Sequence, residues 1–259
     1  MYLMIILIMS GSFFDEWFYY RVLTLSSFTN LHSVKQFSLC LPNHMWYPIK
    51  SPIWLRCLYP QLTWHRSREK AILYLTFDDG PIPIVTPAIL KILRTYGIKA
   101  TFFCVGENIV KYPDIFEEVL RDGHSVGNHT FHHLKGWKTS KDIYLSDIAK
   151  CQELTNSKLF RPPYGRGTRA QYSSLQKEYE IIMWDVMTGD FDLTTSPQKC
   201  LNQTIKHAKN GSIVVFHDNI KAEERVLYAL PKAIEYWLAK GYRFETLSYK
   251  EAKLFDNKR

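Results

Sequence analysis

The segment LYLTFDDGP at Leu73–Pro81 decides how the rest of the chain is interpreted. Its apolar and aromatic residues predict a buried strand, and the Gly-Pro pair predicts an immediate turn after it. The strand ends in two adjacent carboxylates, Asp78 and Asp79, which repel each other. A metal ion bound by one carboxylate and a cationic side chain held by the other would stabilise this arrangement. An ordinary surface turn of the same composition is the alternative.

The composition indicates a globular protein with a sizeable core. The chain has 259 residues, of which 46% are hydrophobic and 22% charged, and this suits one large domain or one domain with an appendage. A formal net charge of +8 would suit a polyanionic partner, but the basic residues are scattered and form no stripe that alternates with aromatic residues. We therefore expect no nucleic-acid partner. The aromatic content of 15% suits either a carbohydrate-facing groove or a bulky core.

Cysteine usage and the first residues bear on the compartment. The five cysteines form an odd set without paired spacing, so we expect neither a disulfide framework nor a Cys-x-x-Cys metal site. Buried thiols favour a reducing compartment. The apolar residues Met1–Met9 are too few to span a bilayer, and they lack the basic residues of a secretory signal. These features favour a cytoplasmic or membrane-adjacent location without a membrane span, and they leave the oligomeric state open.

The first 66 residues differ from the rest of the chain. Up to His44 there is no clear period and no usable turn signal, whereas Met45 opens a segment rich in Trp, Tyr and Pro. We expect residues 1–66 to be an irregular N-terminal extension, in which residues 1–44 are poorly ordered or belong to an over-long gene model. Residues 67–259 are then expected to form the folded domain.

From Ala71 onward, strand and helix signals alternate. Strands are predicted over residues 71–77, 99–105, 124–129, 158–161, 181–186, 212–217 and 243–247. Helices are predicted between them, including one with Thr86 as its N-cap, one opened by Pro113, one over 140–156, one capped by Ser196 and one over 222–240. About seven β-α units imply an α/β fold with a parallel sheet, most simply closed into a barrel.

Polar residues cluster where four of these strands end. In a barrel of this kind, reactive groups belong at the carboxyl ends of the strands. We therefore expect the four polar ends to lie on one rim. They are Asp78-Asp79, His129–His133, Arg161–Tyr164 and His217-Asp218.

The segment HTFHH at His129–His133 offers two histidines four residues apart, which a helical turn or tight loop places on the same side. With an aspartate they form a three-ligand set for Zn²⁺ or a similar divalent ion, leaving a coordination position open. His132 should point elsewhere. A solvated polar loop is the alternative.

These motifs carry a resemblance to a known family. They are TFDDGP at Thr76–Pro81, HTxxH at His129–His133, RPPYG at Arg161–Gly165 and the strand ending at His217. Their order resembles that of polysaccharide deacetylases with the NodB homology domain, carbohydrate esterase family 4, over roughly residues 70–248. The resemblance implies a distorted (β/α)7-type barrel of parallel strands, with residues 67–259 as the NodB homology domain. It also implies metal-dependent removal of N- or O-acetyl groups from sugars.

The resemblance further implies a role for each matching residue. The metal ligands would be Asp79, His129 and His133, holding Zn²⁺, with Co²⁺ or Ni²⁺ as alternatives. Asp78 would be the general base that activates the attacking water. Arg161 would lie beside Asp78 and keep it ionised and oriented.

The other implied roles concern the oxyanion, the sugar and the leaving amine. The backbone N–H of Tyr164 would help to stabilise the oxyanion, and Pro163 and Trp184 would line the substrate site. His217 would protonate the leaving amine, and Asp190 would hold it as imidazolium.

Some positions depart from the family pattern. Met187 stands where the family often has a second acid, Phe191 where it has a tryptophan, and Val215 where a leucine is usual. These departures leave substrate specificity and the tuning of His217 open, but they spare the metal ligands. Trp137, like Trp184, is a candidate platform for stacking on a sugar, although a core aromatic needs no such role.

We predict a metal-dependent deacetylase that acts on an N-acetylhexosamine-containing glycan or glycoconjugate of the peptidoglycan or chitin type. A catalytically silent carbohydrate-binding relative is the first alternative. A metal hydrolase of another amide or ester is the second, since the same activation of water serves other acyl groups.

Overall fold

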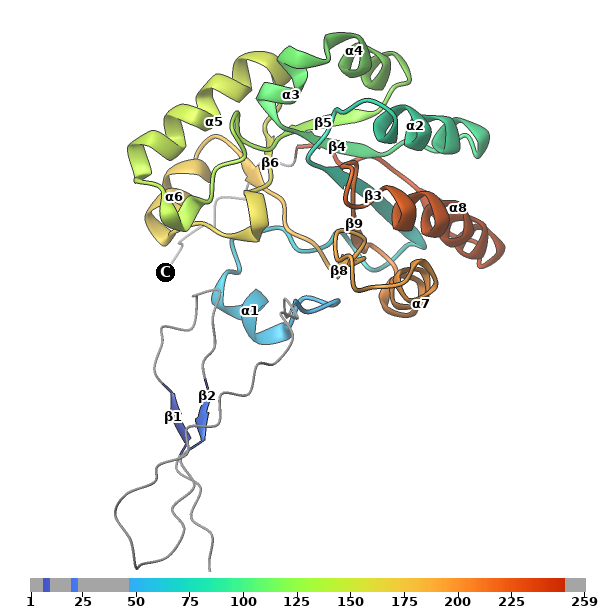
Figure 1. Ribbon diagram of the computed structural model, residues 1–259, viewed down its shortest axis with the longest axis horizontal. Coiled ribbons are helices and arrows are strands. Elements are labelled where there is room, and N and C mark those ends of the chain that lie inside the picture. Colours follow the sequence, from blue (N-terminus) through green and yellow to red (C-terminus); the bar gives the residue numbers. More distant parts are fainter. Residues whose placement is uncertain (1–6, 10–19, 23–46, 250–259) are drawn as a thin grey trace, which may run out of the picture. The chain divides into compact units, whose positions relative to one another are not determined.

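The computed structural model describes residues 7–9, 20–22 and 47–249 (Figure 1). The chain divides into two units, Met1–Met45 and Trp46–Arg259. Within the described part of the first unit, strands β1 (Leu7–Met9) and β2 (Tyr20–Val22) pair antiparallel. Our expectation for residues 1–44 lies largely outside the described residues and stays a prediction, as does the boundary after residue 66.

The second unit contains one parallel sheet. Its strands are β3 (Ile72–Asp78), β4 (Thr101–Cys104), β5 (Ser125–Asn128), β6 (Leu159–Phe160), β7 (Glu180–Ile181), β8 (Val186–Met187), β9 (Ile213–His217) and β10 (Arg243–Phe244). Their order is β7-β6-β5-β4-β3-β9-β8, and β10 pairs with the first residues of β3. The predicted α/β barrel of parallel strands is confirmed in this curled sheet.

One predicted strand, over residues 181–186, is wrong as a single element. Strands β7 and β8 are its two ends, and β7 pairs with β6 while β8 pairs with β9, so residues 182–185 connect the two edges of the sheet. The middle of the segment hydrogen-bonds instead to the chain before β3. The N–H of Met183 donates to the carbonyl of Thr63 at 2.7 Å. The N–H of Ser51 donates to the carbonyl of Asp185 at 3.1 Å.

Helices surround this sheet, and Figure 1 shows α5, α3, α4, α2 and α8 in an arc outside the strands. The helices are α1 (Ile53–Leu58), α2 (Val85–Thr95), α3 (Gly106–Lys111), α4 (Pro113–Arg121), α5 (Lys141–Thr155), α6 (Arg169–Leu175), α7 (Pro197–His207) and α8 (Glu223–Ala239). Short 3₁₀ turns occur at Gly136–Lys138 and Pro163–Gly165. Of the helix starts that we predicted, the Ser196 cap of α7 is confirmed, since its side chain accepts from the N–H of Lys199.

The predicted N-cap at Thr86 is wrong, because α2 already begins at Val85. The hydroxyl of Thr86 has other partners. It accepts from the N–H of Ile82 at 2.9 Å and donates to the carboxylate of Asp218 at 2.7 Å. This threonine therefore ties the loop after β3 to the end of β9.

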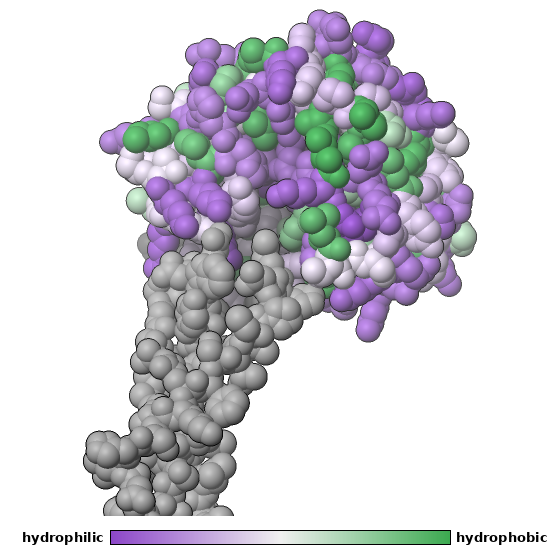
Figure 2. All heavy atoms as spheres, viewed as in Figure 1, coloured by the Kyte–Doolittle hydropathy of each residue, from purple (hydrophilic) through white to green (hydrophobic). Residues whose placement is uncertain are grey.

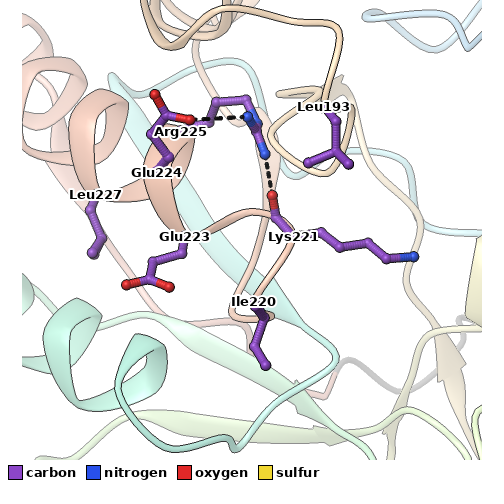
Figure 3. A pocket seen from close by; sticks show the side chains of 7 residues that line it. All are labelled: Leu193, Ile220, Lys221, Glu223, Glu224, Arg225 and Leu227. Carbon is purple, nitrogen blue, oxygen red and sulfur yellow. Dashed lines mark hydrogen bonds and ion pairs between the residues drawn. The ribbon is translucent and has the colours of Figure 1, made fainter.

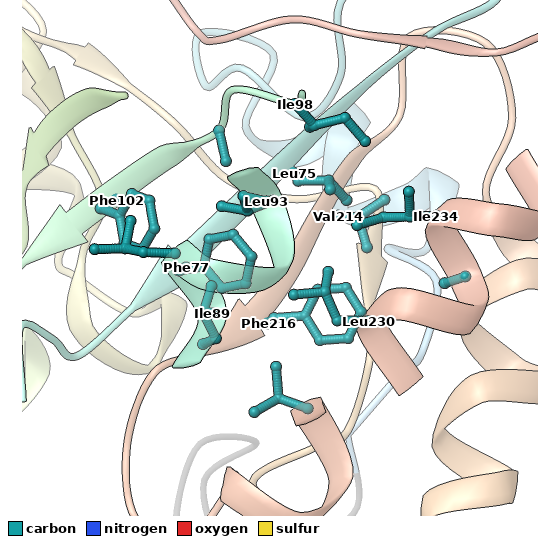
Figure 4. Close-up of a cluster of buried hydrophobic side chains, with 14 of the residues drawn as sticks. Leu75, Phe77, Ile89, Leu93, Ile98, Phe102, Val214, Phe216, Leu230 and Ile234 are labelled. Carbon is teal, nitrogen blue, oxygen red and sulfur yellow. The ribbon is translucent and has the colours of Figure 1, made fainter. Parts of the chain in front are cut away.

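The hydrophobic core packs around the strands whose carboxyl ends carry the predicted polar residues. Phe77 on β3 lies between Phe102 of β4 and Phe216 of β9, with ring centroids 4.9 and 6.0 Å apart (Figure 4). All three rings are buried, and a buried phenylalanine contributes roughly 1.5–3 kcal/mol. The register pairs Asp78 with Phe103 of β4 and with His217 of β9. Packing around Phe77 thus fixes where the next residue, Asp78, emerges.

The surface of the described residues is mainly hydrophilic on the face drawn in Figure 2, with smaller hydrophobic clusters between the polar side chains. No helix among the described residues is long and apolar enough to cross a bilayer.

Candidate active site

Three side chains from two loops converge at the carboxyl ends of β3 and β5. Oδ1 of Asp79 lies 3.1 Å from Nε2 of His133 and 3.5 Å from Nε2 of His129. One ligand atom from each of the three residues lies within 4.8 Å of the others. Within the described chain, this is the one group of acidic, histidine or cysteine side chains placed so that it could share an ion. The structure therefore brings together the three residues that we predicted as ligands.

The backbone at this rim adopts conformations that are uncommon for residues other than glycine. Positive φ angles occur at Asp79 (85°), Thr130 (65°), His133 (54°) and Tyr164 (60°). Such residues cost free energy and persist where surrounding contacts over-determine them, which is common at functional sites. Asn128 provides one such contact, because its Oδ1 accepts from the N–H of Thr130 at 2.9 Å.

The donor set fits a divalent ion. Nδ1 of His129 lies 2.8 Å from the carbonyl oxygen of Arg161, which can only accept a hydrogen bond. The proton of the neutral imidazole is thereby placed on Nδ1, and the lone pair of Nε2 points at Asp79. Two imidazoles and one carboxylate are a common ligand set of Zn²⁺ and similar ions.

The surroundings of Asp79 favour the ionised form of its carboxylate. Burial alone would raise its pKa, but the adjacent side chains of His129 and His133 and the charge of His217 hold it well below the usual value. Two asparagines that the sequence analysis missed also contact this residue. Asn219 donates to its Oδ2 at 2.6 Å, and Asn108 donates to its backbone carbonyl at 2.7 Å.

Asp78 points to a different partner, a fully buried arginine. Nη1 of Arg161 donates to Oδ1 of Asp78 at 2.5 Å and to the hydroxyl of Thr76 at 2.8 Å. The same guanidinium donates to the backbone carbonyls of Ile182 and Met183. Burial lowers the pKa of Arg161 and the charge of Asp78 opposes this, but a guanidinium remains protonated. The predicted pairing of Asp78 with Arg161 is thus present.

His217 is paired with the carboxylate that the sequence analysis assigned to it. Its Nδ1 lies 2.8 Å from Oδ1 of Asp190, and its backbone N–H donates to Oδ2 of Asp190 at 2.7 Å. Burial alone would lower the pKa of the imidazole, but Asp190, with smaller contributions from Asp79 and Asp78, raises it to about 9. Arg225, which was not predicted from the sequence, donates from its Nε to the backbone carbonyl of Asp190 at 2.6 Å.

Tyr164 and Trp184 form one wall beside the ligands. The ring of Tyr164 is half exposed, and its centroid lies 4.9 Å from that of His133. Trp184 packs so closely on Gly165 that a Cβ there would lie 2.1 Å from the indole. Pro163, at the start of this turn, is buried.

Two other residues that we singled out lie differently. His132 turns away from the cluster, as expected, with its Nδ1 2.5 Å from Oδ1 of Asp147 on α5. The Trp137 ring is covered by the guanidinium of Arg166 at 4.0 Å, so this face of the ring stacks on a protein side chain rather than on a sugar.

Asp218 was expected on the rim, at the end of the strand that carries His217, but no role was predicted for it. It is buried, and it accepts from the N–H of Gly80 at 2.9 Å and from the hydroxyl of Thr86. A Cβ at position 80 would lie 1.8 Å from Oδ2 of Asp218, so only glycine fits there. Burial is the main cause that raises the pKa of Asp218 to about 8. Its place directly after His217 was the one signal available in the sequence.

A separate hollow of about 460 Å³ lies between the loops that follow β8 and β9 and the first turns of α8 (Figure 3). Its lining includes none of the three ligands. The residues are Leu193, Ile220, Lys221, Glu223, Glu224, Arg225 and Leu227. The hollow adjoins the site through Arg225, which bonds to the carbonyls of Asp190 and Lys221.

Comparison with known proteins gives consistent matches. Residues 65–181 match the family model described as polysaccharide deacetylase. A peptidoglycan-N-acetylglucosamine deacetylase of Bacillus cereus is 32% identical over 72% of this chain and 91% of its own length. A chitooligosaccharide deacetylase of Azorhizobium caulinodans is 32% identical over 70% of this chain and 86% of its own length.

The solved structures agree with these relatives. A crystal structure of a peptidoglycan N-acetylglucosamine deacetylase in complex with 4-naphthalen-1-yl-N-oxidanyl-benzamide has a TM-score of 0.69 and 33% sequence identity. The match covers 72% of this chain and 91% of the chain in that crystal structure.

Proposed function

Since this chain belongs to the polysaccharide deacetylase family, we propose that it removes acetyl groups from an N-acetylhexosamine-containing glycan, using a divalent ion. The observation that carries this proposal is the convergence of Asp79, His129 and His133 beside an acid and a base. The relatives support the substrate class, because two of them are named for peptidoglycan N-acetylglucosamine and for chitooligosaccharide. Every residue in the proposed machinery lies within residues 67–259, which we propose as the catalytic domain.

The proposed ion is Zn²⁺, with Co²⁺ or Ni²⁺ as alternatives that suit the same ligands. When bound, such an ion polarises the amide carbonyl and lowers the pKa of a water molecule towards ~7. Asp79 would contribute a carboxylate oxygen, and His129 and His133 would contribute Nε2 nitrogens.

Asp78 is the proposed general base. Its carboxylate takes a proton from the attacking water, whose oxygen forms a bond to the acyl carbon. The charge-assisted bond from Arg161 keeps the carboxylate oriented for this task. We propose that the backbone N–H of Tyr164 stabilises the oxyanion, at roughly 3 kcal/mol for a well-placed donor. Pro163 and Trp184 would support that turn and line the sugar site.

His217 is the proposed general acid. A pKa of about 9 means that the imidazole carries its proton at neutral pH. When the C–N bond breaks, the imidazolium gives this proton to the nitrogen, and acetate and a free amine leave. Asp190 would orient the imidazole through Nδ1 and leave Nε2 to face the amine.

The two alternatives make different use of the same site. A silent carbohydrate-binding relative would lack the base or the acid, whereas Asp78 and His217 are both present and both paired. A hydrolase of another amide or ester would share the chemistry but not the preference for N-acetylated sugars.

An acetate-release assay distinguishes the proposed deacetylase from the two alternatives. The purified chain would be incubated with chitooligosaccharides and with peptidoglycan fragments, and simple acetyl esters and acetanilides would serve as competing substrates. We expect acetate from at least one glycan and far slower turnover of the small amides and esters. Release only from the small compounds would contradict the proposed substrate class, and no release from any of them would favour the silent relative.

A further inference from the structure

Asn219 touches the proposed metal site although none of the motifs contains it. It lies two residues after His217, and its Nδ2 donates to Oδ2 of Asp79 at 2.6 Å. The other oxygen of Asp79, Oδ1, lies 3.1 and 3.5 Å from Nε2 of His133 and His129. The two oxygens of this one carboxylate therefore have different partners.

The amide of Asn219 can take only this orientation. Its Oδ1 accepts from the backbone N–H of Ala222 at 3.0 Å, at the start of α8. A backbone N–H can only donate and an ionised carboxylate can only accept, so the amide nitrogen must face Asp79. The start of α8 thus fixes a donor against one oxygen of the ligand.

A second asparagine holds the backbone of the same ligand. Nδ2 of Asn108 on α3 donates to the carbonyl of Asp79 at 2.7 Å. Asp79 has a φ of 85°, so its carbonyl needs a partner that keeps this uncommon conformation. Backbone and side chain of Asp79 are thereby held by groups from two separate elements, α3 and the loop that precedes α8.

We infer that Asn219 is a positioning residue that selects Oδ1 of Asp79 as the metal ligand and keeps Oδ2 out of the ligand set. This inference rests on the divalent ion of the proposed function and adds to it how the carboxylate is presented. Hydrogen bonds to the second oxygen of a ligating carboxylate orient it, and loss of such outer partners typically weakens metal binding by about 10- to 100-fold.

The test compares Asn219→Ser with the wild-type full chain. A serine hydroxyl can still accept from the N–H of Ala222, but it is too short to reach Asp79, so the helix start is kept and only the donor is lost. Ser196→Ala is the matched control. It removes a comparable cap from α7, where the side chain accepts from Lys199 at 3.2 Å, and it touches no ligand.

Each protein would be stripped with a chelator and titrated with Co²⁺ against a competing indicator, while the visible absorption of the bound ion and the thermal unfolding midpoint are recorded. We expect Asn219→Ser to bind Co²⁺ at least about tenfold more weakly, with an altered absorption spectrum, whereas Ser196→Ala binds as wild type. Equal affinity and an unchanged spectrum in Asn219→Ser would overturn the inference alone. A wild-type chain that binds no Co²⁺ would instead overturn the proposed function, and the inference with it.

Discussion

Asp78 and His217 occupy paired positions at the ends of the neighbouring parallel strands β3 and β9. Each is held by a buried partner of opposite charge, Asp78 by Arg161 and His217 by Asp190. The next residue of β3's loop, Asp79, meets the two histidines. A proton acceptor, a proton donor and the proposed ion site therefore share one rim, which is the arrangement that hydrolysis of an amide requires.

Replacing Asp78 by asparagine should remove the proton acceptor and keep the shape of the side chain. We expect kcat for acetate release to fall about 100- to 10,000-fold, the range for loss of a general base. Metal affinity should change little, because Asp78 is not among the three converging ligands. Asp142→Asn, at the exposed start of α5, is the control and should leave kcat unchanged. Full activity of Asp78→Asn would refute the assigned base.

Two neighbouring histidines should respond differently to the same change. His129→Ala removes one of the three ligand atoms, so we expect the ion to be lost on gel filtration together with activity. His132→Ala removes a side chain bonded to Asp147, away from Asp79, so the ion should be retained. Metal content by mass spectrometry checks both variants. Equal retention in the two would show that the cluster is not the ion site.

The alkaline limb of the pH–rate profile should depend on Asp190. His217 is proposed to act in its protonated form, and its pKa is raised to about 9, so activity should be present at neutral pH and be lost as the pH rises through this value. A divalent ion bound nearby would lower the pKa of His217, so the alkaline limb is expected at or below about pH 9. Asp190→Asn removes the largest raising influence and should move the limb to lower pH, measured as kcat/KM against pH. An unmoved limb would exclude His217 as the titrating acid.

Arg161 should matter for stability as well as for turnover. Its replacement by methionine leaves the buried carboxylate of Asp78 without a cation, and breaking a buried pair from one side costs about 3–5 kcal/mol. Arg94→Met provides the contrast, since Arg94 is 47% exposed and its bonds to Glu118 and Asp122 are worth about 0–1 kcal/mol. Urea unfolding gives both values. A loss at Arg161 no larger than at Arg94 would contradict the buried pairing.

The convergence of the main residues of the candidate site could be predicted from the sequence because parallel strands deliver their carboxyl ends to one rim. Asp79, His129 and His133 are brought together as predicted, and Asp78 meets Arg161. Strand ends are visible in a sequence, since an apolar run stops at a polar residue.

The contacts that hold those residues could not be predicted in the same way. Asn219 and Asn108 lie in a loop and a short helix, where an asparagine is ordinary, and only the folded chain shows that both amides reach Asp79. Thr86 resembled a helix cap by composition, but its hydroxyl bonds to Asp218. The strand predicted over 181–186 is divided, and Ser51 and Thr63 hydrogen-bond to its middle, which is a pairing between segments far apart in the sequence.

The most direct test of the central claim is acetate release by the full chain after its metal has been removed and replaced. We predict that the chelated protein releases no acetate from N-acetylated glycan, and that one equivalent of Zn²⁺ or Co²⁺ per chain restores the rate. Acetate release at an undiminished rate by metal-free protein would contradict the claim that Asp79, His129 and His133 hold an ion on which the reaction depends.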